Sequence, residues 1–575
     1  MPSLKGKGEV PLPARALLRL HSVHCLLPTA YCLLLTAYFS QAIPQTTNST
    51  SASQRHYELG AAALQKQDWT AAIRELRLAL KARPQWAAAH NALGSALMQT
   101  RQFDEAVKEF RQATALDPDL APAHLNLGKA LERRNDLDGA IMCYENAIRL
   151  QPDWAEPHDA LGFLLGHRGN LLGAKSEFES AVKLEPNSSD AHYHLGVTDY
   201  LQRDYPSAAS ELREALRLRP ANSDARYYLG QTYQQQGQMA QAISELQVAV
   251  KLKPDSGEFQ NALGEALQQE GDLVDAAVAL REAIKLKPDD PEPHNNLGLV
   301  LLNQGDGDNA IKEFQRALKL NPRSPAASNN LGLAYLQKAQ WEEAIAEYRS
   351  LIRVAPDYAE AYYNLAVALK EKEDFDGATT ALHRAIELDP SLPEAHYTLG
   401  VVFWQQGELD KAAAELRAAA EARPNYEQAH SVLGSVLRQK GDLDAAQAEL
   451  QAALKLDPQD AGAHQALGTV YKQKGNTTAA SEEFSRSEEI NKAKMNVQAA
   501  TLATNTGANQ LREGDVDGAI EKFRAALKLA PDFAPAHFQL GMAFLRKGDS
   551  AQASAEFEKA HQLDPHLRPP RQGQE

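Results

Sequence analysis

The chain has 575 residues and three cysteines, and its 60 lysines and arginines against 75 aspartates and glutamates give a formal net charge of −15. An acidic chain repels phosphate backbones, which disfavours a nucleic-acid-binding protein. Three cysteines are too few for a disulfide framework or a four-cysteine zinc site, which disfavours a disulfide-rich protein and a structural zinc protein of that type. At about 150 residues per domain, the length predicts roughly four globular domains, provided that the sequence has no internal repeat.

The N-terminal segment, residues 1–42, differs in composition from everything that follows. Four basic residues and one acidic residue give it a charge of +3, and an apolar run from Cys25 to Phe39 then leads to small residues. Basic, apolar and small residues in this order are typical of a secretory signal peptide. The apolar run contains Pro28 and is short for a membrane span. We predict a signal peptide at 1–42, with a membrane anchor or a miscalled start as alternatives, and a polar linker at 43–52.

From residue 53 onward, one pattern recurs every 34 residues. Leucines stand 34 residues apart from Leu59 to Leu467, glycine follows almost all of them, and a proline lies 25 residues after each leucine as far as Pro458. Each repeat holds two amphipathic stretches with helical spacing. Such a unit cannot bury its own apolar face and must stack on its neighbours. Repeats 1–13 fill 53–494 and repeats 14 and 15 fill 500–567, so the chain is predicted to be one array of small units.

Repeat 8, residues 291–324, shows why certain letters are fixed. Gly298 in its first stretch and Ala310 in its second are small where the two helices must approach closely. Between the stretches, Gly305 and Asp306 have the chemistry of a helix C-cap and of the next N-cap. A proline ends the second stretch, because it cannot continue the hydrogen-bond ladder. The repeat is therefore predicted to be a helical hairpin.

These letters resemble the tetratricopeptide repeat pattern, which has leucine at position 7, glycine at position 8, alanine at position 20 and proline at position 32. The resemblance covers fifteen repeats, about nine-tenths of the chain. It implies an all-α fold, a right-handed α-solenoid in which antiparallel helix pairs stack into a superhelix. It also implies an inner groove, lined by the first helix of each repeat, that binds extended peptides or partner helices.

Histidine occupies position 4 in ten repeats, which is a departure from the aromatic residue of the family pattern. So many histidines in one slot invite a metal site. A second helix stands between successive first helices, however, and makes shared ligation improbable. We therefore predict a packing role for these histidines and no metal.

The second departure is the break near 491–499. Lys492 replaces the expected proline, and the five residues 495–499 are inserted before repeat 14. This stretch contains helix formers and no breaker. We expect one long helix to join repeats 13 and 14, with a kink or a change of superhelical phase.

The resemblance places positions 2, 5, 6, 9, 12 and 13 of each first helix in the groove. Position 5 is never basic, so the family's lysine clamp for a C-terminal carboxylate is missing, which argues against a cytoplasmic co-chaperone-like adaptor. Asparagine is frequent at positions 5 and 6, and its amide can donate to and accept from a peptide backbone. This asparagine ladder resembles that in the repeats of O-linked N-acetylglucosamine transferases, although no glycosyltransferase domain follows. The predicted partner-binding residues are Asn295, Asn296, Asn329, Asn330, Tyr363, Asn364, Tyr397 and Trp404.

The C-terminal end lacks a feature that such arrays commonly have. An extra helix usually covers the last repeat, but the residues after Pro565 contain two prolines that forbid a helix. An apolar edge of repeat 15 is therefore expected to be exposed and to support self-association through the C-terminal repeats. Residues 568–575 are predicted to be a disordered tail.

No motif for catalysis stands out. The sequence contains no Gly-rich phosphate loop, no His-Glu-x-x-His and no paired Cys-x-x-Cys, so we predict no enzyme and no cofactor. The leading hypothesis is a non-catalytic scaffold, exported to the periplasm or the cell surface, that binds peptide segments or assembles protein complexes. The alternatives are a targeting or regulatory subunit of a separately encoded enzyme such as a glycosyltransferase, and a cytoplasmic protein if the N-terminus is miscalled.

Overall fold

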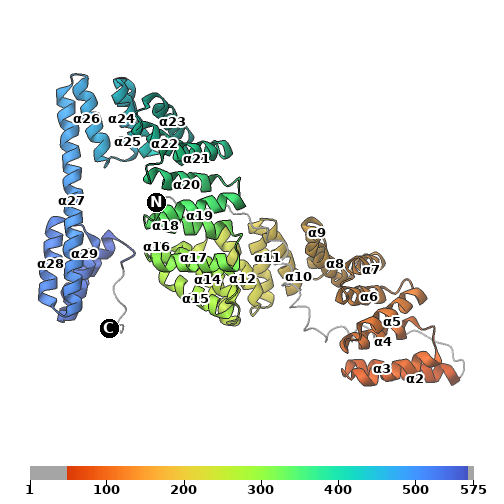
Figure 1. Cartoon of the computed structure of the whole chain (residues 1–575). Helices are drawn as coiled ribbons and strands as arrows, with labels where there is room; N and C mark the ends of the chain where they lie inside the picture. Colours follow the sequence, from red (N-terminus) through yellow and green to blue (C-terminus); the bar gives the residue numbers. More distant parts are fainter. Residues whose placement is uncertain (1–47, 568–575) are drawn as a thin grey trace. The chain divides into compact units, whose positions relative to one another are not determined.

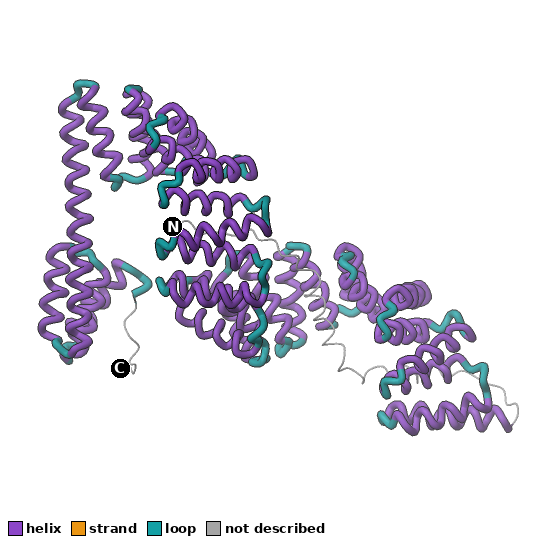
Figure 2. The backbone as a smooth tube through the Cα atoms, in the orientation of Figure 1, coloured by secondary structure: helices purple, strands orange, loops and turns teal. Residues whose placement is uncertain are grey.

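The computed structural model describes residues 48–567, in which all regular secondary structure is helical (Figures 1 and 2). The predicted signal peptide or anchor at 1–42 and the predicted tail at 568–575 lie outside these residues. The predicted linker at 43–52 is wrong in part, because helix α2 already begins at Asn48. Between residues 48 and 567, no helix combines the length and the apolar character needed to cross a bilayer.

The described helices alternate between the first and the second helix of successive repeats, and consecutive helices pack on each other from α2 to α17 and from α19 to α30. The chain divides into two compact units, with the boundary in the sequence between Ala334 and Tyr335. In the first unit, the first helices are α2 (Asn48–Gln65), α4 (Ala87–Gln99), α6 (Ala121–Arg133), α8 (Ala155–His167), α10 (Ser189–Leu201), α12 (Ser223–Gln235), α14 (Gly257–Glu270) and α16 (Pro291–Asn303). Its second helices are α3 (Trp69–Ala82), α5 (Phe103–Leu116), α7 (Leu137–Leu150), α9 (Leu171–Leu184), α11 (Tyr205–Leu218), α13 (Met239–Leu252), α15 (Leu273–Leu286) and α17 (Gly307–Leu320).

Helix α18 (Pro325–Gln337) contains the division between the units. The second unit continues with α19 (Trp341–Val354), α20 (Ala359–Glu371), α21 (Phe375–Leu388), α22 (Pro393–Gln405), α23 (Leu409–Ala422), α24 (Glu427–Lys440), α25 (Leu443–Leu456) and α26 (Ala461–Gln473). It ends with α27 (Thr477–Glu513), α28 (Val516–Leu529), α29 (Ala534–Lys547) and α30 (Ser550–Leu563). The predicted all-α fold, a solenoid of consecutive helix pairs, is confirmed.

The turn inside repeat 8 forms as its letters predict. Gly305 follows α16 in the left-handed region, with φ of 81°, and glycine enters this region without steric cost. Asp306 is the N-cap of α17, and its carboxylate accepts a hydrogen bond from the Asn309 amide at 3.3 Å. The short turn reverses the chain and brings the two helices of the repeat together.

The core of each repeat is built around a small residue on the first helix. A Cβ atom added to Gly298 would lie 2.5 Å from Cε1 of Phe314, whose side chain is fully buried on α17. Ala310 and Ala317 on the same helix are also buried. The close approach predicted at Gly298 and Ala310 is thus present, and small residues allow thin helical layers to bury aromatic rings.

Helix α27 joins repeats 13 and 14, as the missing proline predicts. It runs without interruption through 37 residues, from Thr477 to Glu513. Because the chain does not turn back, the first helix of repeat 14 has no preceding second helix against it. Leu502 at position 3 is 70% exposed, whereas its counterparts Ala463 and Ala536 are fully buried.

The expectation of an exposed apolar edge on repeat 15 is wrong. In repeat 14, Ile520 is buried and Leu527 is half-buried on the second helix. The equivalent residues of α30 are Ser554 and His561, which are exposed and polar. Polar side chains therefore end the array in the described part of the chain, and self-association loses its predicted apolar basis.

Candidate functional site

The surface formed by the first helices of successive repeats is called the first-helix face here. In the first unit it is joined by a ladder of side-chain hydrogen bonds from position 6 of one repeat to position 5 of the repeat before. Asn296 Nδ2 donates to Asn261 Oδ1 at 3.1 Å, and Asn330 Nδ2 donates to Asn295 Oδ1 at 2.9 Å. Asn126 and Asn91 make the same contact at 2.9 Å near the start of the array. The position-6 asparagines thus connect neighbouring repeats.

The structure places the four predicted asparagines of the first unit together on α16 and α18. Asn295, Asn296, Asn329 and Asn330 are all half-buried. An asparagine amide has two donor hydrogens and two acceptor lone pairs, so one ladder bond leaves capacity for a ligand. Their role in peptide binding stays a prediction. Their role in joining repeats was missed, although the 35-residue step between positions 5 and 6 was visible in the sequence.

The other four predicted residues belong to the second unit, on α20 and α22. Asn364 is buried, and Tyr363, Tyr397 and Trp404 are half-buried. Trp404 Nε1 donates to Gln439 Oε1 of the next first helix at 3.0 Å. Burial raises the pKa of Tyr363 and of Tyr397, so both phenols stay protonated near neutral pH. These residues offer aromatic surface with polar tips.

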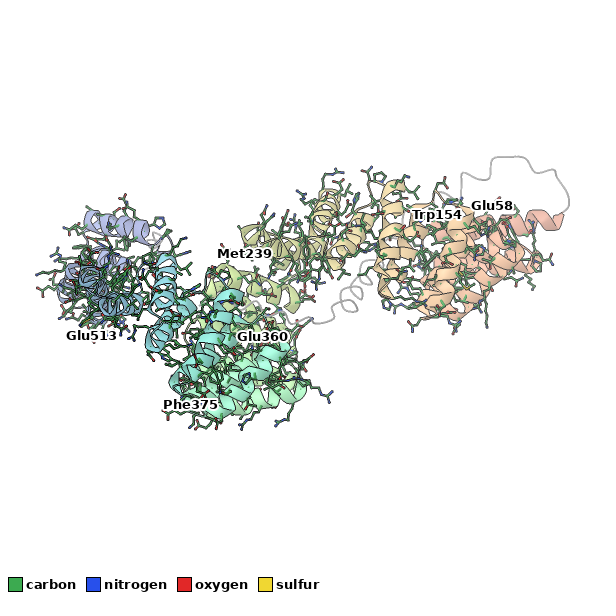
Figure 3. All side chains as sticks on the ribbon, turned by 90° about the horizontal axis from the view of Figure 1, so that it is seen from above. Glu58, Trp154, Met239, Glu360, Phe375 and Glu513 are labelled. Atoms are coloured by element: carbon green, nitrogen blue, oxygen red, sulfur yellow. The ribbon has the colours of Figure 1, made fainter. Side chains whose placement is uncertain are left out.

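A second ladder crosses the first-helix face at a 31-residue step, between repeats 5 and 7. Tyr200 Oη donates to Gln231 Oε1 at 3.0 Å, and Tyr227 Oη donates to Glu258 Oε1 at 3.0 Å. Gln234 Nε2 donates to Glu265 Oε1 at 3.3 Å. Position 2 therefore lies beside position 5 of the preceding repeat, and position 9 lies beside position 12. Figure 3 marks Glu360, which also occupies position 2 on a first helix, and Phe375, which begins the second helix of the same repeat.

The histidines at position 4 do more than fill space. In seven repeats, Nδ1 lies within 2.8 Å of a glutamate 19 residues later, and Nε2 contacts the carbonyl oxygen of the proline six residues earlier: His90, His158, His192, His396, His430, His464 and His537. At His158 and His396 a carboxylate oxygen and a carbonyl oxygen face the two ring nitrogens, which favours the imidazolium, in which both nitrogens donate. The hydrogen bonds to Glu177 and Glu415 accordingly raise the pKa of His158 and of His396.

Repeat 6 carries a permanent cation at position 4 and makes the same two contacts. There Arg226 replaces histidine, and it contacts Glu245 at 2.5 Å and the carbonyl oxygen of Pro220 at 3.3 Å. The residue at position 4 therefore makes polar contacts that join the two helices of a repeat, whereas the sequence predicted a packing role alone. The glutamate 19 residues downstream was the available signal. Across residues 48–567, no three histidine, cysteine, aspartate or glutamate side chains gather to hold a metal ion.

Repeat 3 lacks this glutamate and has Cys143 in its place. His124 keeps its contact with the Pro118 carbonyl oxygen at 3.0 Å. Cys143 is a buried free thiol, and burial raises its pKa to about 11. A thiol in this state is a poor nucleophile, because the thiolate is the reactive form.

Comparison with known families gives three kinds of match. The "Tetratricopeptide repeat" family matches residues 57–121, 91–155, 161–223, 199–266 and 506–567, and "TPR repeat" matches residues 269–305. The family described as "Cilia and flagella-associated protein 70 C-terminal domain" matches residues 298–503. No curated protein matches the chain.

Solved structures with similarity to this chain are numerous. Yeast Tom70 is 17% identical, with a TM-score of 0.38, over 75% of this chain and 97% of its own. YrrB, whose title calls it a TPR protein with an unusual peptide-binding site, is 24% identical, with a TM-score of 0.29, over 32% of this chain and 95% of its own. A MamA RS-1 ArsTM double mutant is 27% identical, with a TM-score of 0.28, over 29% of this chain and 94% of its own.

Proposed function

The chain belongs to the tetratricopeptide repeat family, and from that premise we propose that it is a non-catalytic scaffold whose first-helix face binds extended peptide segments of partner proteins. Packing positions such as position 20 are nearly invariant along the chain, whereas first-helix positions 2, 5 and 9 change from repeat to repeat. Recognition in a repeat protein resides in such variable surface residues, because the fixed ones are needed for stacking.

The observation that carries this proposal is that side-chain hydrogen bonds between neighbouring repeats order the first-helix face. The ladders through Asn296, Asn330 and Tyr227 restrict the rotamers of side chains that would otherwise be free in solvent. Because these side chains are already ordered, less side-chain conformational entropy is lost when a ligand binds, and this favours binding. The partly exposed tyrosines and Trp404 add amphipathic contact area.

Affinity capture from the native host with the full chain tests the proposal. We expect the triple variant Asn296→Ala, Asn330→Ala and Asn364→Ala to lose most of the captured protein. The matched control replaces three exposed amides of second helices, Gln112, Gln241 and Gln562, by alanine. Because the asparagines also join repeats, circular dichroism and thermal unfolding must show that the variant remains folded. Unchanged capture by a folded triple variant would contradict the proposal.

We also propose that the protein is exported to the periplasm or the cell surface. This part rests on the sequence of residues 1–42 alone, in which basic, apolar and small residues follow one another as in a signal peptide. Cell fractionation with N-terminal sequencing of the mature protein tests it. An intact N-terminus in the cytoplasmic fraction would refute export.

The match over residues 298–503 favours a second candidate, a repeat protein associated with cilia and flagella. The same localisation experiment discriminates between the two, because a fluorescent fusion at a cilium or flagellum supports the second candidate and contradicts export to the periplasm. Both candidates share the protein-binding role of the first-helix face.

A further inference from the structure

The junction between repeats 4 and 5 carries an ionisable pair where other junctions carry uncharged side chains. His194 Nδ1 on α10 lies 2.7 Å from Asp159 Oδ1 on α8, at the positions that asparagine pairs occupy in the ladder described above. At every other junction the residues at these two positions are uncharged. The His194 side chain is fully buried, and its ring centroid lies 5.3 Å from that of Phe178 and 6.4 Å from that of Phe163. The pair therefore lies in the core between the two repeats, where its protonation state affects how they join.

A second ionic contact lies at the same junction. Lys175 Nζ on α9 lies 2.7 Å from Asp199 Oδ1 on α10 and 3.5 Å from Oδ2 of Asp204, the N-cap residue of α11. The Asp199 side chain is only 2% exposed. At the junction between repeats 3 and 4, the residues equivalent to Lys175 and Asp199 are Ile141 and Leu165. Repeats 4 and 5 are thus joined by two ionic contacts at positions where other junctions have neutral or apolar side chains.

These ionic contacts make the coupling at this junction depend on protonation. Burying a charge removes its hydration, so a buried ion pair contributes less to stability than apolar residues of similar size, and loss of either charge leaves the other without compensation. In a repeat array, cooperativity passes through the interfaces between neighbouring repeats. A change of protonation at this one junction therefore acts on the connection between repeats 1–4 and the repeats that follow.

The charges around His194 hold its proton in the folded chain. Burial alone would lower the pKa of His194, but the charge and hydrogen bond of Asp159, together with the charge of Asp190, raise it overall. Asp190 is itself paired with Arg219 at 2.7 Å, and the phenol ring of Tyr193 lies 5.5 Å from the imidazole between centroids. The folded pKa thus exceeds the unfolded value of about 6.5. The stabilisation by this proton is fully present below that value and is lost as the pH rises through the folded pKa.

The groups around Asp199 act in the same direction. Burial raises the pKa of Asp199, the charges of Asp204 and Glu211 raise it further, and contact with Lys175 lowers it only in part. The same contact raises the pKa of Lys175. Both groups therefore hold their protons more tightly in the folded chain, and each loses stabilisation as the pH rises through its folded pKa. Among these groups, His194 has the reference pKa nearest to neutral, so it governs the response there.

We propose that the junction between repeats 4 and 5 is a pH-sensitive hinge, at which repeats 1–4 open from the repeats that follow more readily as the pH rises through neutral. The pair of His194 and Asp159 is the sensor, because it crosses the junction and is buried. The contact between Lys175 and Asp199 makes the junction weaker than an apolar one and so allows the sensor to act. The hinge concerns the coupling of repeats and is independent of which ligand the first-helix face binds.

Amide hydrogen exchange of the full chain tests the proposal, with mass spectrometry between pH 5 and pH 9 and correction for the intrinsic exchange rate. We expect peptides from α8 to α10 to lose protection at least fivefold between pH 6 and pH 8.5. The reference is the junction between repeats 7 and 8, where an asparagine bond and the buried apolar residues Ala277 and Leu301 occupy the same positions. Peptides from α15 and α16 should change by less than twofold. An equal loss of protection at the two junctions would overturn the proposal.

Two double variants separate the sensor from the second ionic contact. Asp159→Asn with His194→Asn rebuilds the asparagine pair of the ladder, and we expect the change in protection between pH 6 and pH 8.5 to fall below twofold. Lys175→Ile with Asp199→Leu installs the residues of the preceding junction, and we expect greater protection at every pH, with the fivefold ratio retained. The histidines of position 4 remain in both variants, so their hydrogen bonds within each repeat are a constant background.

Circular dichroism shows whether each variant is folded. If the asparagine variant is not, the single variant Asp159→Asn carries the test. It removes a charge that raises the pKa of His194, so the midpoint of the pH profile should move to lower pH. Full pH dependence in a folded asparagine variant, or an unmoved midpoint in Asp159→Asn, would contradict the hinge.

Discussion

The contact between Gly298 and Phe314 makes a quantitative test of how the repeats pack. In Gly298→Ala, the new methyl group would lie 2.5–2.9 Å from three ring atoms of Phe314, and the fully buried ring cannot swing into solvent. Overpacking of this kind costs about 1–3 kcal/mol, and the better helix propensity of alanine returns about 1 kcal/mol. We expect a net loss of about 1 kcal/mol, which is about a fivefold increase in local opening.

Amide hydrogen exchange is the assay of choice, because an array of repeats opens locally rather than all at once. Peptides from α16 and α17 should exchange about fivefold faster in Gly298→Ala, while those from α2 to α5 should not change. Repeat 10 suggests a variant that should relieve the clash. Its residues equivalent to Gly298 and Phe314 are Ala366 and Leu382, and both are buried.

The double variant Gly298→Ala with Phe314→Leu recreates this natural pair in repeat 8. Phe314→Leu alone should cost about 1 kcal/mol through the cavity that it leaves. The double variant should cost less than the sum of the single variants, because the methyl group then occupies part of that cavity. Additive losses, or unchanged exchange in Gly298→Ala, would refute the steric account of the glycine.

Three further outcomes follow from other parts of the structure. The hydrogen bond to Glu177 raises the pKa of His158. Its stabilisation of the fold is therefore fully present below the unfolded histidine pKa of about 6.5 and is lost as the pH rises through the folded pKa. His158→Gln should lower the melting temperature more at pH 6 than at pH 9. Cys143 should resist a thiol reagent at pH 8 in the native chain and react after unfolding in urea, because burial raises its pKa to about 11; fast native labelling would contradict this burial. Met495→Pro should break α27 at its exposed middle, with loss of helical circular dichroism and faster exchange near the substitution, because proline inside a helix costs about 3 kcal/mol. Met495→Ala at the same exposed position serves as the control and should leave both signals unchanged.

The regular part of the fold could be predicted from the sequence because its physics is local. Gly305 and Asp306 form a turn through their own backbone and side-chain preferences, and Gly298 is small because a ring faces it. The long α27 was equally readable, since Lys492 stands where proline would end the helix. In each case one or two residues decide the local conformation.

The candidate site was harder to predict, because its bonds join residues one repeat apart. The sequence showed the asparagines, but it did not show that Asn330 donates a hydrogen bond to Asn295 in the preceding repeat. The glutamates 19 residues after the position-4 histidines are visible in the sequence, but only the fold shows that the two side chains meet, so these hydrogen bonds were not predicted. The polar end of repeat 15 was missed for a different reason, since a comparison of Ser554 with Ile520 in the preceding repeat was needed to recognise it.

Helix α27 has a consequence for how unfolding spreads along the chain. On its repeat-13 half, Ser481 and Glu488 are exposed, and on its repeat-14 half Leu502 and Thr506 are exposed, so neither half carries the interface that couples neighbouring repeats elsewhere. In a one-dimensional array, cooperativity passes only through such interfaces. The buried clusters of repeats 14 and 15 are separate from the cluster that ends at Val470, so we expect these two repeats to unfold as a cooperative unit of their own. We therefore expect unfolding that begins in repeats 14 and 15 not to spread past α27, so that thermal unfolding of the chain shows two transitions.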